Sequence, residues 1–283
     1  MKLRIRHSTR YTYDQKVQLN IHEFYLIPLQ RFYFKVLKSN WTVFPTPLGF
    51  HERINFENNP YFQAWFTGDS DFLEIKSDFE IEVGEFNPYG FIIQPQPVFP
   101  FGTFSYPEEV RDYLRIYIEG EKLPGLDDFV KSVMKESDGL VGFLVLLLAK
   151  IHSNWEHIIR HEEGIMPLGE VFESKIGSCR DLSWMLMSML RSIGLACRFV
   201  SGYAFNPELD AGHELHAWVE VFLPGASWIG LDPSLGLLTD HHHIPLASHP
   251  NPKRTLPVQG TFSGQAESKL LTRVDIKLLH RSK

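Results

Sequence analysis

The chain has 283 residues, of which 43% are hydrophobic and 22% charged, a composition typical of a soluble globular protein with one or two domains. A formal net charge of −6 argues against a surface that binds nucleic acid. With only two cysteines, the chain has neither a disulfide framework nor a zinc-type cysteine cluster.

No targeting segment and no membrane span are visible. Residues 1–7 alternate apolar and basic side chains and lack the apolar stretch of a signal peptide. The longest apolar stretch, residues 139–149, is too short for a bilayer span, so we expect a buried helix there. Free thiols suit a reducing compartment, and we predict a cytoplasmic protein without membrane or nucleic-acid partners.

Residues 1–107 are predicted to form a β-rich domain. Leu3, Ile5 and His7 alternate with basic residues, and residues 79–83 alternate apolar with acidic side chains, the pattern of half-buried strands. Aromatic and β-branched runs at 32–37, 41–44 and 64–67 have strand length, and turn sequences separate them. Four prolines between 95 and 107 mark a linker. The region contains no group of side chains typical of a catalytic or metal site. We therefore interpret it as an antiparallel, sandwich-like domain that supports the second half of the chain.

From residue 108 the hydrophobic period becomes helical. We expect a short helix over 108–117, one or two helices over 126–157, and a helix over 181–193 that ends at Gly194. Strands are predicted near 196–205, 215–223 and 227–232, followed by an irregular tail through 248–252 and a last strand over 270–279. The predicted fold class is therefore α+β, with domains at 1–107 and 108–283.

Cys179 lies just before the helix predicted over 181–193. Ser178 and Asp181 have the spacing of a capping box, which places Cys179 in the first helical turn. Unpaired backbone N–H groups and the helix dipole favour an anion there and so lower the pKa of a thiol toward neutrality. The Cys179 N–H could also donate a hydrogen bond to an oxyanion. A free cysteine is more often a small buried side chain, and that interpretation fits Cys197, which lies in a strand-like run.

A base and a carboxylate are predicted on the hairpin that follows. With Pro224 at the centre of a three-residue loop, His216 lies directly opposite Asp232 on the same face of the sheet. The carboxylate would then hold one imidazole nitrogen while the other points at the thiol. A two-residue Pro-Gly turn would instead place the two side chains on opposite faces unless a bulge intervened. Taken alone, each is an ordinary strand or turn residue.

A metal site is the competing interpretation of the histidines. Residues 213–216 read His-Glu-Leu-His, and residues 241–243 are three consecutive histidines. The first segment lacks the helical spacing of a zinc protease motif, and the second is interpreted as solvated loop beside Asp240. We therefore predict no metal and no cofactor.

Three segments resemble the transglutaminase-like superfamily of papain-fold cysteine enzymes, especially its prokaryotic, cysteine protease-like branch. They span 177–205, 216–238 and 243–247 and contain Gly-x-Cys-x-Asp, Arg-x-Val-Ser-Gly-Tyr, His-Ala-Trp-x-Glu and Asp-Pro-Ser in this order. The β-rich front is also similar to the N-terminal region of many members. The resemblance implies a papain-like core with Cys179 as nucleophile, His216 as base and Asp232 as orienting residue.

The resemblance does not fix the side chain that would stabilise an oxyanion. Asn154 and Trp155, on the preceding helix, are candidates, and Trp218 is a further oxyanion or substrate candidate. We predict an enzyme that hydrolyses a peptide, isopeptide or carboxamide bond of a peptide or protein substrate through a thioester. A transglutaminase and a non-catalytic binding module with the same cleft are the alternatives, because a sequence does not show which nucleophile reaches the acyl-enzyme.

Overall fold

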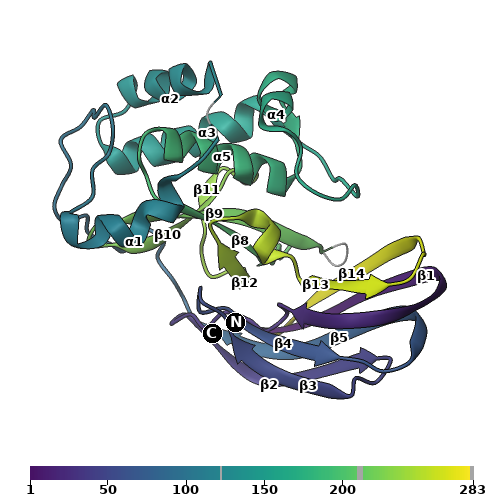
Figure 1. Cartoon of the computed structure of the whole chain (residues 1–283). Helices are drawn as coiled ribbons and strands as arrows, with labels where there is room; N and C mark the ends of the chain where they lie inside the picture. Colours follow the sequence, from purple (N-terminus) through teal and green to yellow (C-terminus); the bar gives the residue numbers. More distant parts are fainter. Residues whose placement is uncertain (122, 209–212, 281–283) are drawn as a thin grey trace.

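The computed structural model describes residues 1–121, 123–208 and 213–280. A helical layer lies above an antiparallel sheet, and a β-rich region lies below that sheet (Figure 1). The helices are α1 (Glu108–Ile118), α2 (Leu126–Lys135), α3 (Leu140–Asn154), α4 (Leu168–Ser174) and α5 (Cys179–Ser192). The mixed α+β class is therefore confirmed.

The sheet under the helices has five strands in the order β11-β10-β9-β8-β12. Their bounds are β8 (Cys197–Ala204), β9 (Leu215–Leu223), β10 (Ser227–Asp232), β11 (Leu237–Leu238) and β12 (His243–His249). Ala217, Val219 and Val221 join the core formed with the helices, and His216, Trp218 and Glu220 alternate with them. The predicted irregular tail is partly wrong, because residues 248 and 249 end strand β12.

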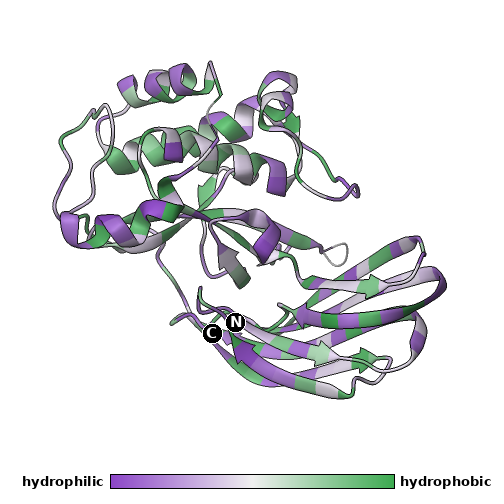
Figure 2. Ribbon diagram, in the orientation of Figure 1, coloured by the Kyte–Doolittle hydropathy of each residue, from purple (hydrophilic) through white to green (hydrophobic). Residues whose placement is uncertain are grey.

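The β-rich region is one continuous seven-stranded sheet rather than two stacked sheets. Its strands are β1 (Lys2–Phe24), β2 (Phe34–Phe44), β3 (Gly49–Ile54), β4 (Pro60–Trp65), β5 (Asp69–Val83), β13 (Val258–Ser263) and β14 (Ser268–His280). The first half of β1 pairs with β5 and β14, and its second half pairs with β4 and β13. Alternation predicted strands at residues 3–7 and 79–83, which lie in β1 and β5. Hydrophobic and hydrophilic residues form bands along the strands of this sheet (Figure 2).

The predicted domain boundary needs a correction. Strands β13 and β14 belong to the β-rich sheet although they follow the helices and the five-stranded sheet, so residues 108–283 are not one domain. The first and last strands pair from Lys2↔His280 onward, which brings both ends of the chain together (Figure 1). Because the paired residues are so distant in sequence, no local sequence pattern predicts this pairing.

The two regions share packing and polar contacts. Tyr203, Phe205, Ile244 and Leu246 of the region with the helices and the five-stranded sheet belong to the same apolar cluster as the inner face of β1 and β5. The loop after β1 also reaches across, because Arg31 Nη2 lies 2.8 Å from Glu220 Oε1 in β9. The β-rich region is therefore packed against the sheet that carries the site.

Helix α5 lies at the centre of the helical region. Its predicted apolar stripe is confirmed by the burial of Leu182, Met185, Leu186, Met189 and Leu190. Residues 139–149 form most of α3, which packs into the same core, and no helix within the described ranges is long and apolar enough to cross a membrane. The cytoplasmic location stays a prediction.

Candidate active site

The start of α5 is fixed by a buried carboxylate. Asp181 is fully buried, and its Oδ2 accepts hydrogen bonds from the Ser178 backbone N–H at 2.9 Å and from the Ser178 hydroxyl at 2.5 Å. Its Oδ1 accepts the Met166 N–H at 2.8 Å, and Arg160 Nη1 lies 3.3 Å from Oδ2. The predicted capping box is present and also attaches residues 160–166 to the helix start.

This helix start presents the Cys179 thiol to two imidazoles. Burial raises the pKa of Cys179, but hydrogen bonds from His157 and His216, together with the charge of His216, outweigh burial and lower it to about 6. The Ala217 N–H also donates to the sulfur. Cys197 is the contrast, since burial raises its pKa to about 12 against the opposing charge of Arg191. The thiol at position 179 is thus suited to ionise at neutral pH.

His216 is held by Asp232 at a distance of 2.6 Å between Nε2 and Oδ2. This bond leaves Nδ1 for the hydrogen bond with Cys179. Burial opposes a charge on the ring, but the Asp232 carboxylate outweighs it and raises the pKa of His216 well above its ordinary value. A thiolate–imidazolium pair is the protonation state that this arrangement favours.

The predicted register of the hairpin is wrong by two residues. Leu223 pairs with Ser227 and Leu231 with Val219, so the three-residue loop is centred on Gly225 rather than Pro224. A shift of two residues keeps the same side chains on each face of the sheet. His216 and Asp232 are therefore diagonal neighbours instead of direct partners, and they still meet.

The Asp232 carboxylate is fully buried and saturated with donors. Its Oδ1 accepts the Ser234 N–H at 3.0 Å, the Ser234 hydroxyl at 2.7 Å and the Leu235 N–H at 3.0 Å, while Oδ2 faces His216. Burial would raise its pKa, but the charge of His216 and the hydrogen bonds from the histidines lower it well below its usual range. The Asp-Pro-Ser turn thus fixes an ionised carboxylate behind the base.

A second histidine shares this carboxylate, and sequence reasoning missed it. His243 Nε2 lies 3.1 Å from Asp232 Oδ2, and its Nδ1 accepts the Asp240 N–H at 3.3 Å. His243 is only 3% exposed, so its interpretation as solvated loop is wrong. Gly202 of β8 lacks the Cβ that would come 2.7 Å from the Trp218 ring, which lets the indole lie against His243.

His157 was also missed, although it lies beside the thiol. Strand β6 (Glu156–His157) runs parallel to β7 (Ile176–Gly177), with His157 opposite Gly177, two residues before Cys179. The signal available in the sequence was only a histidine after the apolar helix, which has no recognisable spacing to the cysteine. The contact depends on the short β6–β7 pairing.

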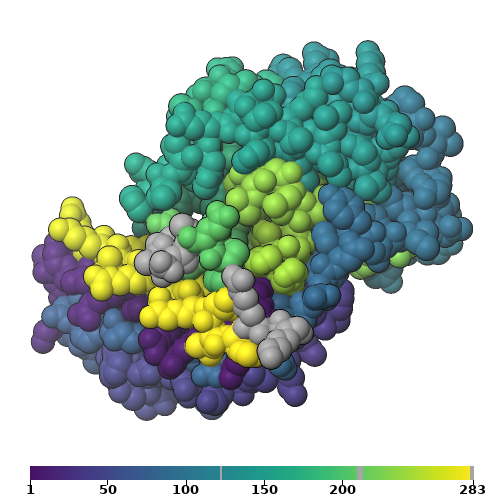
Figure 3. Space-filling model, turned by 180° about the vertical axis from the view of Figure 1, so that it is seen from behind, coloured from purple at the N-terminus to yellow at the C-terminus, as the bar shows by residue number. Residues whose placement is uncertain are grey.

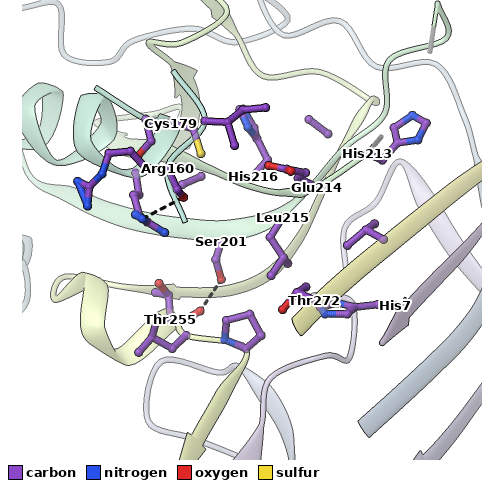
Figure 4. A pocket seen from close by; sticks show the side chains of 18 of the residues that line it. His7, Arg160, Cys179, Ser201, His213, Glu214, Leu215, His216, Thr255 and Thr272 are labelled. Carbon is purple, nitrogen blue, oxygen red and sulfur yellow. Dashed lines mark hydrogen bonds between the residues drawn. The ribbon is translucent and has the colours of Figure 1, made fainter. Parts of the chain in front are cut away.

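A large cavity of about 2250 Å³ opens in front of these groups. Cys179 and His216 lie on one side, and His7 and Thr272 of the β-rich region lie on the opposite side (Figure 4). The oxyanion candidates Asn154 and Trp155 do not line it. The Trp155 indole N–H donates to the Val171 carbonyl at 2.9 Å inside the core, so it is not free for a substrate oxygen and that interpretation is corrected.

Trp218 does not line the cavity either. Its side chain is 1% exposed, and its ring centroid lies 5.2 Å from that of His243 and 6.2 Å from that of His216. The indole therefore supports the two histidines from behind rather than contacting a substrate. The Cys179 N–H, in the first turn of α5, keeps the geometry expected of an oxyanion donor.

Two groups of side chains in the described ranges have donor atoms close enough to hold a metal ion. One consists of His216, Asp232 and His243, and the other of Asp240, His241 and His242. In the first group the donors are engaged with each other by hydrogen bonds, which fits an acid–base arrangement. The residues of the predicted His-Glu-Leu-His motif do not converge on one ion: His213 stacks on Phe205 with centroids 5.8 Å apart.

Two parts of the chain match known families. The family model described as the transglutaminase-like superfamily matches residues 128–233, and that of the bacterial transglutaminase-like N-terminal region matches residues 3–82. The crystal structure of a "putative cysteine protease" from Cytophaga hutchinsonii has the same fold, with a TM-score of 0.72 at 16% identity, covering 100% of this chain and 92% of that one.

Sequence relatives add little about activity. An uncharacterized protein of Mycobacterium tuberculosis is 24% identical over 95% of this chain and 90% of the relative. The uncharacterized protein YebA of Bacillus subtilis is 32% identical, and a protein-glutamine gamma-glutamyltransferase of Pseudomonas aeruginosa is 31% identical, each over 23% of this chain. These two matches span only 10% and 11% of the respective relatives. From its two matched regions and its fold, the chain belongs to the transglutaminase-like superfamily.

Proposed function

We propose that the protein is a cysteine-nucleophile enzyme that hydrolyses an amide bond of a peptide or protein substrate. The observation that carries the proposal is the convergence of His157 and His216 on the Cys179 thiol, whose pKa their hydrogen bonds and the charge of His216 lower to about 6 against the effect of burial. His216 is in turn held at 2.6 Å by a buried, ionised Asp232. A thiol, a base and an orienting carboxylate are the parts that nucleophilic acyl transfer requires.

In the first step the Cys179 thiolate attacks the amide carbonyl carbon, and the carbonyl oxygen becomes an oxyanion near the Cys179 N–H. The imidazolium of His216 then gives its Nδ1 proton to the departing amine as the carbon–nitrogen bond breaks. The product of this half-reaction is a thioester on Cys179 and a free amine.

In the second step His216 removes a proton from water, and the resulting hydroxide adds to the thioester carbon. The carbon–sulfur bond breaks, and the carboxylic acid leaves with Cys179 again a thiolate and His216 again protonated. Asp232 keeps its negative charge throughout and stabilises the imidazolium. If a primary amine enters in place of water, the same thioester gives a new amide, which is the transglutaminase reaction.

Amine transfer is the second candidate, favoured by the relative in Pseudomonas aeruginosa named as a protein-glutamine gamma-glutamyltransferase. One experiment separates the two. Reduced, carboxymethylated α-lactalbumin, which stays unfolded, is incubated with the protein in the presence of dansylcadaverine and analysed by mass spectrometry. New N-termini report peptide cleavage, added mass on glutamine reports amine transfer, and deamidation reports carboxamide hydrolysis.

Cys179→Ala should abolish every one of these products. Cys197→Ala is the matched control, because Cys197 is buried and its sulfur donates only to the Leu195 carbonyl, so activity should persist. The proposal fails if wild type and Cys179→Ala give the same products, or if no product forms and Cys179 reacts with iodoacetamide no faster than Cys197. In that case the cleft belongs to a binding module.

A further inference from the structure

One edge of strand β14 is open. The strand pairs with β1 from Lys2↔His280 to Tyr13↔Ser268, and none of the described residues pairs with its other edge. An unpaired edge presents a row of backbone N–H and C=O groups that can bind another extended chain. Viewed from behind, β14 lies at the surface of the β-rich region, below the catalytic region (Figure 3).

This open edge lies in the catalytic cavity. Six consecutive residues of β14, 270–275, line the same cavity as Cys179 and His216. Successive side chains of a strand point to opposite faces, so a cavity that contacts six of them in a row runs along the edge of the strand. Thr272 lies opposite Cys179 and His216 across this space (Figure 4).

The pairing partners on β1 support this geometry. Both Thr9, which pairs with Thr272, and Ser8, which pairs with Arg273, line the cavity, although they point to opposite faces of the sheet. The other side of β1 is covered here by β5, with Ser8 opposite Lys76. The cavity thus contacts residues of β1, β5 and β14, and of these three strands β14 is the one with an unpaired edge among the described residues.

Exposed apolar side chains accompany the edge. Leu270 and Leu271 of β14 are 48% and 52% exposed, and Leu256 before β13 is 53% exposed. On the catalytic side Ile159, at 65%, and Leu235, at 45%, are exposed in the same cavity. Apolar side chains along an open backbone edge fit an unfolded polypeptide, whose main chain pairs with the edge while its side chains contact the apolar residues.

We infer that the substrate of the proposed reaction is an extended polypeptide segment that adds as a strand to the open edge of β14 and thereby reaches Cys179. This inference rests on the proposed function. It gives the β-rich region a part in substrate binding, and it selects unfolded or extended segments over amides on the surface of a folded protein. Backbone hydrogen bonds supply affinity in this mode with little dependence on sequence.

Binding is tested apart from chemistry in the full-length Cys179→Ala variant. Hydrogen exchange of residues 268–280 is measured with reduced, carboxymethylated α-lactalbumin and, as the matched control, with folded α-lactalbumin. We expect exchange within 270–275 to slow about tenfold or more with the unfolded protein only. Unchanged exchange, equal slowing with both proteins, or slowing that grows with the concentration of the variant alone, which indicates a second copy on the edge, would each overturn the inference.

Two neighbouring proline substitutions then test the edge itself. Adjacent backbone N–H groups of an antiparallel strand point alternately toward and away from the partner strand. Of Thr272→Pro and Arg273→Pro, one therefore removes a bond to β1 and lowers the melting temperature, and the other removes only an outward donor. The stable variant of the pair should raise KM for unfolded α-lactalbumin about tenfold, the loss of about one hydrogen bond, with kcat unchanged.

Iodoacetamide labelling of Cys179 does not require a substrate segment on the edge of β14, so it serves as the internal control. It should be the same in wild type and in the stable proline variant. Normal labelling with an unchanged KM overturns the inference while leaving the proposed function intact. Loss of exchange protection in the Cys179→Ala variant carrying the stable proline supports the inference even where no turnover is found.

Discussion

At the residue scale, the site depends on one carboxylate that serves two histidines. Asp232 Oδ2 accepts from His216 at 2.6 Å and from His243 at 3.1 Å, while its Oδ1 is held by the turn that follows. That Cys179, His216 and Asp232 lie together was predictable because each stands in a short motif. The roles of His157 and His243 were not, because each reaches the site through strand pairings that no local pattern encodes.

The thiol should titrate near pH 6. Hydrogen bonds from His157 and His216 lower the pKa of Cys179 against burial, so at pH 7 about nine-tenths of it is thiolate. The rate of iodoacetamide labelling should rise through pH 6 and level off by pH 8. His216→Ala should move the midpoint toward that of an ordinary thiol, and His157→Ala should move it in the same direction. An unchanged midpoint in both variants would contradict the assignment.

The pH profile of kcat/KM should be bell-shaped. Activity appears as pH rises through the pKa of Cys179, about 6, lowered by the histidines against burial, because the thiolate forms there. It is lost as pH rises through the pKa of His216, which Asp232 raises well above 6.5, because the general acid is deprotonated. Asp232→Asn should lower kcat by about 10²–10⁴ and move the alkaline limb down. If the alkaline limb of the profile does not move in Asp232→Asn, Asp232 does not raise the pKa of His216 and the proposed ion pair is contradicted.

His243 should act as a positioning residue. His243→Leu removes a hydrogen bond to a charged group, and we expect kcat/KM to fall about tenfold. Two imidazoles around one carboxylate oppose each other's protonation, so the alkaline limb should also move to higher pH. His243→Gln, whose amide can still donate, should recover most of the activity. If His243→Leu lowers stability but leaves the alkaline limb of the pH profile in place, the role of His243 is purely structural.

At the element scale, the hairpin of β9 and β10 carries the base and its partner, and its register was wrong by two residues in the sequence interpretation. The loop is centred on Gly225, which has a left-handed φ of +80° and lies against the linker. Gln94 N–H donates to the Pro224 carbonyl at 2.9 Å. This long-range contact decides between the possible turns, which is why the local sequence did not.

Gly225→Ala should destabilise the protein more than Gly68→Ala. Both positions have similar positive φ values, +80° and +77°, so both substitutions carry about 1–2 kcal/mol of backbone strain. Only at 225 would the new Cβ lie 2.8 Å from the Ile92 carbonyl oxygen, whereas at 68 nothing lies within 4 Å. Urea unfolding of the pair measures the difference, and equal losses of stability would show that the linker contact is unimportant.

At the scale of the whole molecule, the two predicted domains are interlocked. Strands β13 and β14 complete the β-rich sheet, and a buried carboxylate, Glu220, pairs with Arg31 from one region and Arg198 from the other. Composition and hydrophobic period predicted both kinds of structure along the chain. They could not predict that the last strands return to the first, since that depends on pairing across the whole sequence.

Separate expression of the predicted second domain should therefore fail. A fragment of residues 108–283 lacks β1, so β13 and β14 have no partner strand, and Tyr203, Phe205, Ile244 and Leu246 lose their apolar cover. We expect aggregation or a molten state by circular dichroism and dye binding. The full chain should unfold in a single transition. A monomeric, cooperatively folded fragment would contradict the interlocked arrangement.

The pairing of β1 with β14 also has a consequence for biosynthesis. The ribosome delivers β1 first, but the partner for one of its edges, residues 268–280, is not yet translated while the catalytic segment emerges. Until then β1 can pair with β5 on one edge, but its other edge stays unpaired and is a target for holding chaperones. Native structure in the β-rich region is thus completed only after residues 268–280 have left the ribosome, and slow maturation of newly made protein is the expected signature.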